Sequence, residues 1–171
     1  MKTGFIGKVG RDPFGEYLRE ALLDIGVSIQ GLVVSEEAHT TMAFVQLDAG
    51  GDRSFHFARN PGADQLLNVD EVNHSMLTET RIFHFGSISM TAEPAYSATL
   101  KAVQIAKKHG ALISYDPNWR SSLWRDKEHA LEVIHVGLSL ADVAKLSEEE
   151  LIFLTDEPNL EKAARDLAEQ Y

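Results

Sequence analysis

The segment ISYDPNWRSSLW, residues 113–124, marks the point where an apolar run ends in a cluster of polar side chains. The run ALISY, residues 111–115, is typical of a buried strand. It lies between two stretches with helical character, residues 94–109 and 127–138, and Gly110 ends the first of them. A strand between two helices indicates an α/β domain, in which helices cover a largely parallel sheet.

The rest of the chain continues this alternation of helices and strands. Residues 14–26 have apolar side chains at helical spacing, with Asp12 as the N-cap, Pro13 at the first helical position and Gly26 as the stop. Further strands are predicted at RIFHFGSI (81–88) and DVAKL (142–146), and a short helix at 148–154. A last helix begins after Pro158, and its apolar stripe consists of Leu160, Ala164, Leu167 and Tyr171.

A predicted β-hairpin interrupts the alternation. TTMAFVQL (40–47) and RSFHFAR (53–59) read as strands, and DAGGD (48–52) between them supplies the glycines that a hairpin connection requires. Because strand side chains alternate between faces, Phe55, Phe57 and Arg59 share one face of the second strand. A cation therefore lies at the end of an aromatic stripe.

Length, composition and charge limit the classes of function. The 171 residues, 44% of them hydrophobic, suit one domain, residues 1–171, with the hairpin 41–59 inserted in it. The formal net charge of −10 argues against nucleic-acid partners and anionic membrane surfaces. No stretch approaches the roughly eighteen apolar residues of a membrane span, and no secretory segment follows Met1. Together with the absence of cysteine, this favours a cytoplasmic location.

The polar turn after residue 115 lies where open α/β sheets bind ligands, beyond the carboxyl end of a strand. Asp116 precedes a proline and is restricted to extended geometry, so Asn118 and Arg120 project from a stiff turn. An arginine there offers a planar set of donors to a phosphate or a polyhydroxy compound. The alternative is ordinary turn chemistry with Arg120 as a solvated charge.

Several motifs together resemble the ribokinase-like carbohydrate kinases of the PfkB type, and most closely the fructokinase branch. The motifs are FIGKVGRDPFGEYL, FARNPGADQLL, IFHFGSISM, ISYDPNWRSSLW and KLSEEELIFLT, in the family's order and spacing. The resemblance implies a three-layer α/β/α sheet domain with a small β-sheet lid, to which the hairpin 41–59 would belong. It also implies transfer of a phosphoryl group from ATP, with Mg²⁺, to a sugar hydroxyl.

The resemblance assigns roles to particular residues. Phe44 and Phe57 would line the sugar pocket, and Arg59 and Arg120 would reach the oxygens of the sugar. Asn118 and Arg120 would face the phosphates of ATP. For the two phenylalanines, packing within the hairpin is an equally good explanation. For Arg59 a ligand role is favoured, because packing alone does not explain a charged side chain on an aromatic face.

The segment SEEE, residues 147–150, has two compatible interpretations. Members of the family often have Asn-x-x-Glu there, and the resemblance places Glu150 in the magnesium and phosphate network, acting through water. Ser147 and Glu150 also form the sequence of a capping box at a helix start. No direct metal ligand is expected, and His84, His109 and His135 are interpreted as structural.

Two family motifs do not occur in the sequence. These are the Gly-Gly-x-x-Asn segment that holds the sugar and the Gly-x-Gly-Asp segment that carries the general base. We therefore expect a domain truncated at both ends, without its catalytic aspartate and inactive alone. The alternative is a non-catalytic α/β remnant or interaction module. A Rossmann oxidoreductase is disfavoured, because GFIGKVGRD lacks the Gly-x-Gly opening of the dinucleotide fingerprint.

The resemblance also bears on the small-molecule substrate and on association. Fructose is the first candidate sugar and 2-keto-3-deoxygluconate the second. Lids of this family often meet across a dimer, so the complete protein is expected to form a homodimer through the hairpin. A two-stranded hairpin is marginal alone in water, and its free edge can pair with another chain.

Overall fold

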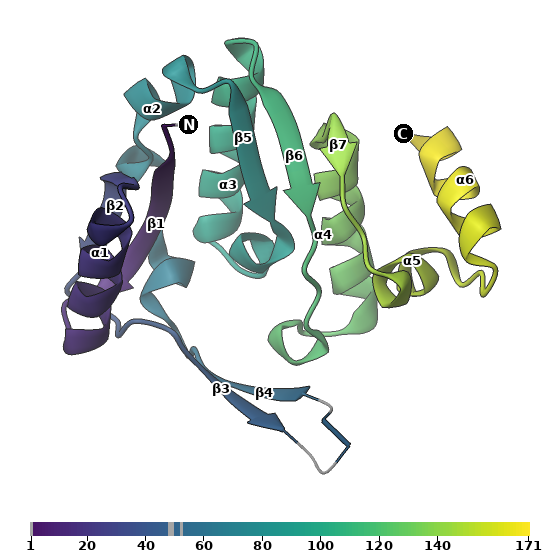
Figure 1. Ribbon diagram of the computed structural model, residues 1–171, viewed down its shortest axis with the longest axis horizontal. Helices are drawn as coiled ribbons and strands as arrows, with labels where there is room; N and C mark the ends of the chain where they lie inside the picture. The colour runs from purple at the N-terminus through teal and green to yellow at the C-terminus, as the bar shows by residue number, and fades with distance from the viewer. Residues whose placement is uncertain (1, 48–49, 52) are drawn as a thin grey trace.

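The computed structural model describes residues 2–47, 50–51 and 53–171 of the chain. Helices and strands alternate along it, as the sequence predicts (Figure 1). The elements are β1 Gly4–Gly10, α1 Pro13–Asp24, β2 Ser28–Ser35, β3 Met42–Leu47, β4 Arg53–Ala58, α2 His74–Glu79, β5 Ile82–Gly86, α3 Ala95–Lys108, β6 Leu112–Asp116, α4 Lys127–Leu140, β7 Val143–Ala144, α5 Glu148–Thr155 and α6 Leu160–Gln170. Short 3₁₀ turns occur at η1 Ala63–Leu66, η2 Val69–Glu71, η3 Ser87–Met90 and η4 Ser121–Leu123.

The strands form separate sheets within the described residues. β1 pairs in parallel with β2, and β5, β6 and β7 form a second parallel sheet in that order. β3 and β4 form an antiparallel hairpin that projects beyond the carboxyl ends of β1, β5 and β6 (Figure 1). The hairpin therefore lies at the edge where α/β sheets bind their ligands.

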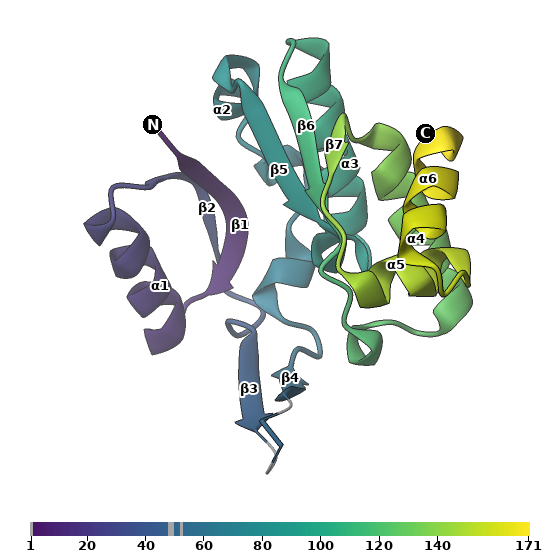
Figure 2. The ribbon, with the colours of Figure 1, turned by 45° about the vertical axis from the view of Figure 1, so that its right-hand side comes forward.

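The main core lies between the second parallel sheet and helices α3 and α4. Figure 2 shows both helices on the same face of β5 and β6. The buried residues Ile113 and Tyr115 of β6 pack there against Val103 of α3 and Ile134 of α4. A Cβ atom on Gly137 would lie 2.3 Å from the Tyr115 ring, so glycine allows α4 its close approach to β6. The α/β prediction is confirmed.

Capping chemistry explains where α1 begins. The Asp12 side chain accepts a hydrogen bond from Gly15 N at 2.8 Å, and Pro13 occupies the first turn, as predicted. Asp12 also accepts from Thr40 N at 2.7 Å and from Thr40 Oγ1 at 2.8 Å. The same carboxylate thus caps the helix and holds the segment that leads into the hairpin.

Some predicted details are wrong. The strand predicted at 142–146 is limited to Val143–Ala144. The stripe of α6 buries Ala163 and Leu167, whereas Ala164 is exposed. In the hairpin connection DAGGD, positions 48, 49 and 52 lie outside the described residues. Over the described part of the chain, no helix is both long and apolar enough to cross a membrane.

Candidate functional site

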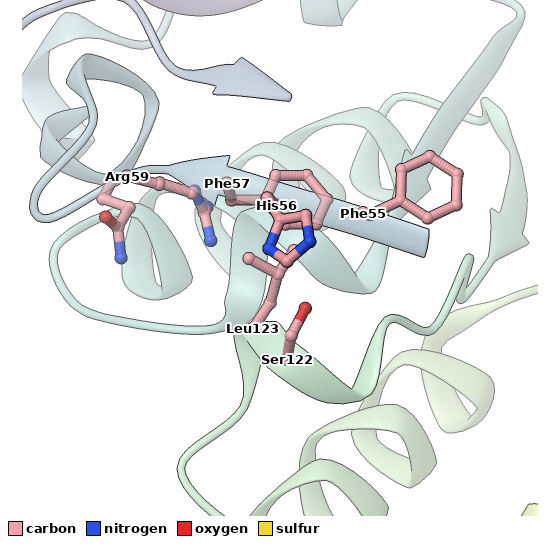
Figure 3. Close-up of a pocket in the computed structure, with 7 residues that line it drawn as sticks. Phe55, His56, Phe57, Arg59, Ser122 and Leu123 are labelled. Atoms are coloured by element: carbon pink, nitrogen blue, oxygen red, sulfur yellow. The ribbon is translucent and has the colours of Figure 1, made fainter. Parts of the chain in front are cut away.

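An open pocket of about 260 Å³ lies beside β4, between the hairpin and the body of the molecule (Figure 3). Its lining comes from β4 and the residue after it, from η1 and from η4. The lining residues are Phe55, His56, Phe57, Arg59, Gln65, Ser122 and Leu123. Aromatic rings combined with an arginine, an amide and a hydroxyl suit a small ligand with both polar and apolar faces.

The register of the hairpin determines which aromatic residues reach the pocket. Phe44 pairs with His56 and Ala43 with Phe57, so Phe44 and Phe57 lie on opposite faces. The Phe55 and Phe57 rings share a face and lie 6.2 Å apart, nearly parallel. Phe57 lines the pocket, whereas Phe44 does not and is 58% exposed.

Arg59 lines the pocket, but its guanidinium is largely bound to protein. Nε donates to Asp64 Oδ2 at 2.8 Å, Nη1 to Thr91 Oγ1 at 2.8 Å and Nη2 to the Ile88 carbonyl at 2.9 Å. Only 3% of the side chain is exposed. Nη2 also lies 2.6 Å from Asp64 Oδ2, so four of the five N–H groups of an arginine face protein acceptors and one, on Nη1, is left for a ligand.

The turn after β6 is held by its own side chains. Asp116 accepts a hydrogen bond from Asn118 N at 3.1 Å through Oδ1, and its Oδ2 pairs with Lys145 at 2.9 Å. This hydrogen bond raises the pKa of Lys145. Asn118 has a φ of 48°, in the left-handed region that asparagine tolerates better than most residues, and it is exposed.

Arg120 connects this turn with the hairpin. Its Nη1 donates to the Trp119 carbonyl at 2.8 Å, and its guanidinium carbon lies 5.0 Å from the centre of the Phe55 ring. That distance is within the range of a cation–π interaction. Arg120 therefore contacts the ring that stacks beside Phe57.

Glu150 joins helix α5 to the turn. Its Oε1 accepts from Trp119 N at 2.7 Å and its Oε2 from Ser147 N at 2.8 Å, while Glu150 N donates to Ser147 Oγ at 3.2 Å. The capping box is confirmed. Glu150 is only 6% exposed, and the Trp119 ring stacks on Phe153 at 4.1 Å. Helix α5 thus fixes the backbone between the predicted ligand residues Asn118 and Arg120.

The histidines in question have protein partners. His84 Nδ1 lies 3.0 Å from Ser114 Oγ, and His109 Nδ1 lies 2.9 Å from the Ile105 carbonyl. His135 Nδ1 lies 2.5 Å from the Tyr171 hydroxyl, and burial lowers the pKa of His135. Across residues 2–47, 50–51 and 53–171, no group of three or more His, Cys, Asp or Glu side chains is arranged to hold a metal ion.

Sequence reasoning missed part of the pocket. His56, Gln65, Ser122 and Leu123 line it but were not candidates. Strand alternation places Phe55 beside Phe57, which is a usable signal. No sequence pattern indicated that η1 and η4 would meet β4.

Comparisons with known proteins agree on one family. The model of the pfkB family carbohydrate kinases matches residues 1–171. Fructokinase-1 of Zea mays is 48% identical over 153 residues, which are 90% of this chain and 47% of that protein. The crystal structure of fructokinase from Xylella fastidiosa with bound ATP superposes with a TM-score of 0.87 at 37% identity, and covers 97% of this chain and 52% of that one.

A second bacterial structure shows the same relation. Fructokinase from Vibrio cholerae, in a form with fructose, ADP and calcium bound, has a TM-score of 0.88 at 33% identity. It covers 98% of this chain and 54% of that chain. The chain therefore spans about half the length of the relatives that it matches.

Proposed function

Because the chain belongs to the pfkB family of carbohydrate kinases, we propose that it is part of an ATP-dependent kinase that phosphorylates a sugar hydroxyl. Fructose is the first candidate, supported by the fructokinases among its relatives, and 2-keto-3-deoxygluconate is the second. The cytoplasm, where ATP is available, is the proposed location.

The pocket beside β4 is the observation that carries this proposal. A sugar presents hydroxyl groups at its edges and C–H groups on its faces. Phe57 offers an apolar face, while Arg59, Gln65 and Ser122 offer polar groups around it. Arg120 donates one hydrogen bond to the Trp119 carbonyl, so its other N–H groups are available to oxygen atoms of a ligand.

Asn118 and Arg120 are the proposed contacts to the ATP phosphates. Both follow the carboxyl end of β6, and a guanidinium suits phosphate oxygens. ATP would supply the phosphoryl group, and these side chains would hold and orient it. Arg120 would also contact the sugar, which places it between the two substrates.

The proposed role of Glu150 in the Mg²⁺ network is indirect. Both of its oxygens already accept backbone amides, and only 6% of the residue is exposed. A carboxylate oxygen can accept a further hydrogen bond from a water molecule. Glu150 would therefore act on metal-bound water and on the Trp119 backbone, not as a direct ligand.

We further propose that the 171-residue protein binds sugar but does not phosphorylate it. Its sequence contains no Gly-x-Gly-Asp segment, so neither the anion-binding amides nor the general base of the family can be assigned to it. The exposed hairpin residues Phe44, Val45 and Leu47 support the proposed homodimer through the lid.

Titration of the protein with D-fructose, followed by NMR amide shifts, tests the proposal. We expect shifts at Phe57, Arg59 and Arg120 in the wild type and their loss in Arg120→Ala. Arg125→Ala is the matched control, because Arg125 is exposed and pairs with Asp126 outside the pocket. Absence of any shift in the wild type would refute sugar binding by this chain. A coupled assay with ATP, Mg²⁺ and fructose should show no turnover, and rates of about 1–100 per second would contradict the inactivity.

A further inference from the structure

The hairpin is tied to the body at both of its ends by one carboxylate. Thr41, just before β3, and Arg59, just after β4, are the roots of the hairpin. Asp64 of η1 binds both of them. Thr41 Oγ1 donates to Asp64 Oδ1, and Arg59 Nε donates to Asp64 Oδ2 at 2.8 Å. The Nη2 atom of Arg59 lies 2.6 Å from the same oxygen.

Arg59 extends this connection to the segment that follows β5. Its Nη2 donates to the Ile88 carbonyl at 2.9 Å and its Nη1 to Thr91 Oγ1 at 2.8 Å. The Arg59 side chain is 3% exposed, whereas that of Asp64 is 34% exposed. The buried cation thus has a partly solvated counter-ion, and removal of Asp64 would leave the charge of Arg59 without a partner.

The side chains at the roots pack closely against Gly62. A Cβ atom on Gly62 would lie 1.8 Å from Thr41 Oγ1 and 2.6 Å from Asp64 Oδ1. A side chain at position 62 would therefore displace the Thr41 hydroxyl and the Asp64 carboxylate from their present positions. Gln65 also caps the Gly62 amide at 3.1 Å and lines the pocket.

We propose that Asp64 is a positioning residue that sets the orientation of the hairpin over the pocket. It acts through Thr41 and Arg59, and it does not line the pocket itself. One wall of the pocket is carried by β4 and another by η1 and η4, so the angle at the roots determines the shape between them. The consequence for sugar affinity rests on the function proposed above, whereas the orientation of the hairpin does not.

The chain offers a matched control for a purely stabilising ion pair. Lys8 and Glu71 lie 2.6 Å apart, with side chains 9% and 26% exposed, and Lys8 also donates to the Leu66 carbonyl at 3.0 Å. This pair joins β1 to the same stretch of 3₁₀ turns but contacts neither root. Glu71→Gln should therefore lower stability without a specific effect on the hairpin.

Amide hydrogen exchange on the 171-residue protein tests the proposal. We expect Asp64→Ala to increase exchange in β3 and β4 about tenfold relative to the amides of α3, because the charged partner of the buried Arg59 is lost. Asp64→Asn keeps a carbonyl oxygen for one root and should give a smaller increase. Glu71→Gln should leave the ratio of hairpin to α3 exchange unchanged.

Two outcomes would overturn the proposal. One is an equal increase in exchange in the hairpin and in α3 with Asp64→Ala. The other is an unchanged hairpin. If Asp64→Ala does not fold, Asp64→Asn and Thr41→Val decide by the same ratio. Residual dipolar couplings provide the readout that a stability effect would not move, since a rotated hairpin changes the couplings of β4 relative to β6.

Titration with D-fructose separates this proposal from the proposed function. If the wild type binds fructose, Asp64→Ala should weaken binding about tenfold while Glu71→Gln leaves it unchanged, and equal affinities in all variants would contradict the positioning role. If the wild type binds no fructose, the proposed function fails, and the exchange ratio and couplings still decide the role of Asp64.

Discussion

Replacement of Glu150 tests whether one buried carboxylate holds the turn after β6, which carries Asn118 and Arg120, in place. The two informative changes are Glu150→Gln, which keeps the shape of the side chain, and Glu150→Ala, which removes it. In the wild type, Oε1 accepts Trp119 N at 2.7 Å and Oε2 accepts Ser147 N at 2.8 Å. A glutamine side chain can accept a hydrogen bond only through its oxygen, because its NH₂ group is a donor. In Glu150→Gln one of the two backbone amides would therefore face the NH₂ group and lose its acceptor.

The expected cost follows from these two hydrogen bonds. A backbone amide bound to a charged acceptor contributes about 1.5 kcal/mol or more, and a buried amide left without a partner loses that amount. Glu150→Ala should therefore lower the free energy of unfolding by about 3 kcal/mol, and Glu150→Gln by about half as much. For a chain of this length, about 3 kcal/mol corresponds to a fall in Tm of roughly 9 °C.

Urea unfolding, followed by far-UV circular dichroism at neutral pH, measures these changes. Glu149→Gln is the control, because Glu149 occupies the same first turn of α5 and is exposed. It should change the free energy of unfolding by less than about 0.5 kcal/mol. If Glu150→Gln matches the wild type, the two amides do not depend on this carboxylate. If it matches Glu150→Ala, the charge rather than the number of acceptors is responsible.

Three further predictions concern the ligand, pH and association. In a complete kinase, Arg120→Ala should raise the Michaelis constants for sugar and ATP and lower turnover. Ser147→Ala should mainly lower the free energy of unfolding, by about 1 kcal/mol. Unchanged kinetics in Arg120→Ala would show that Arg120 is a solvated charge. Burial acts to raise the pKa of Asp12, but hydrogen bonds from Thr40, Gly15 and Phe14 outweigh it and hold the pKa below the usual value of 3.8. Asp12 therefore adds stability that is complete above pH 4 or so and is lost as pH falls through its folded pKa, and unfolding curves of Asp12→Asn should lack this part of the acid dependence. Sedimentation velocity at several concentrations should show self-association that Phe44→Ser reduces, whereas a single monomeric species at all concentrations would contradict pairing through the hairpin.

The features that sequence predicted well are those fixed by neighbours in the chain. Helix α1 begins where Asp12 and Pro13 place it, and the capping box of α5 has the geometry expected from Ser147 and Glu150. These signals act over a few residues, so no tertiary information is needed to interpret them. The order of the predicted strands and helices follows from apolar periodicity in the same way, whereas β1, β2 and α2 were not among them.

The features that sequence could not predict depend on contacts between distant segments. Phe44 and Phe57 lie on opposite faces of the hairpin because of the cross-strand register, which residue types alone do not reveal. The Oε1 atom of Glu150 accepts a hydrogen bond from the Trp119 amide, 31 positions away, and Arg59 donates to Thr91, 32 positions away. Arg59 was selected because it lies on an aromatic face, and it lines the pocket, but its partners in the body belong to the tertiary structure.

A rotation of the hairpin about Thr41 and Arg59 would have the geometry of a lever. Along an extended strand each residue advances about 3.3 Å, so Phe57 lies roughly 7 Å and Phe55 roughly 13 Å from Arg59. A tilt of about 10° at the pivot would therefore displace Phe57 by only about 1 Å but Phe55 by more than 2 Å. The contact of Arg120 with the Phe55 ring, at 5.0 Å, lies on the far part of this arm. Small rotations at Thr41 and Arg59 would therefore leave Phe57 almost in place, but they would be large enough at Phe55 to make or break its contact with Arg120.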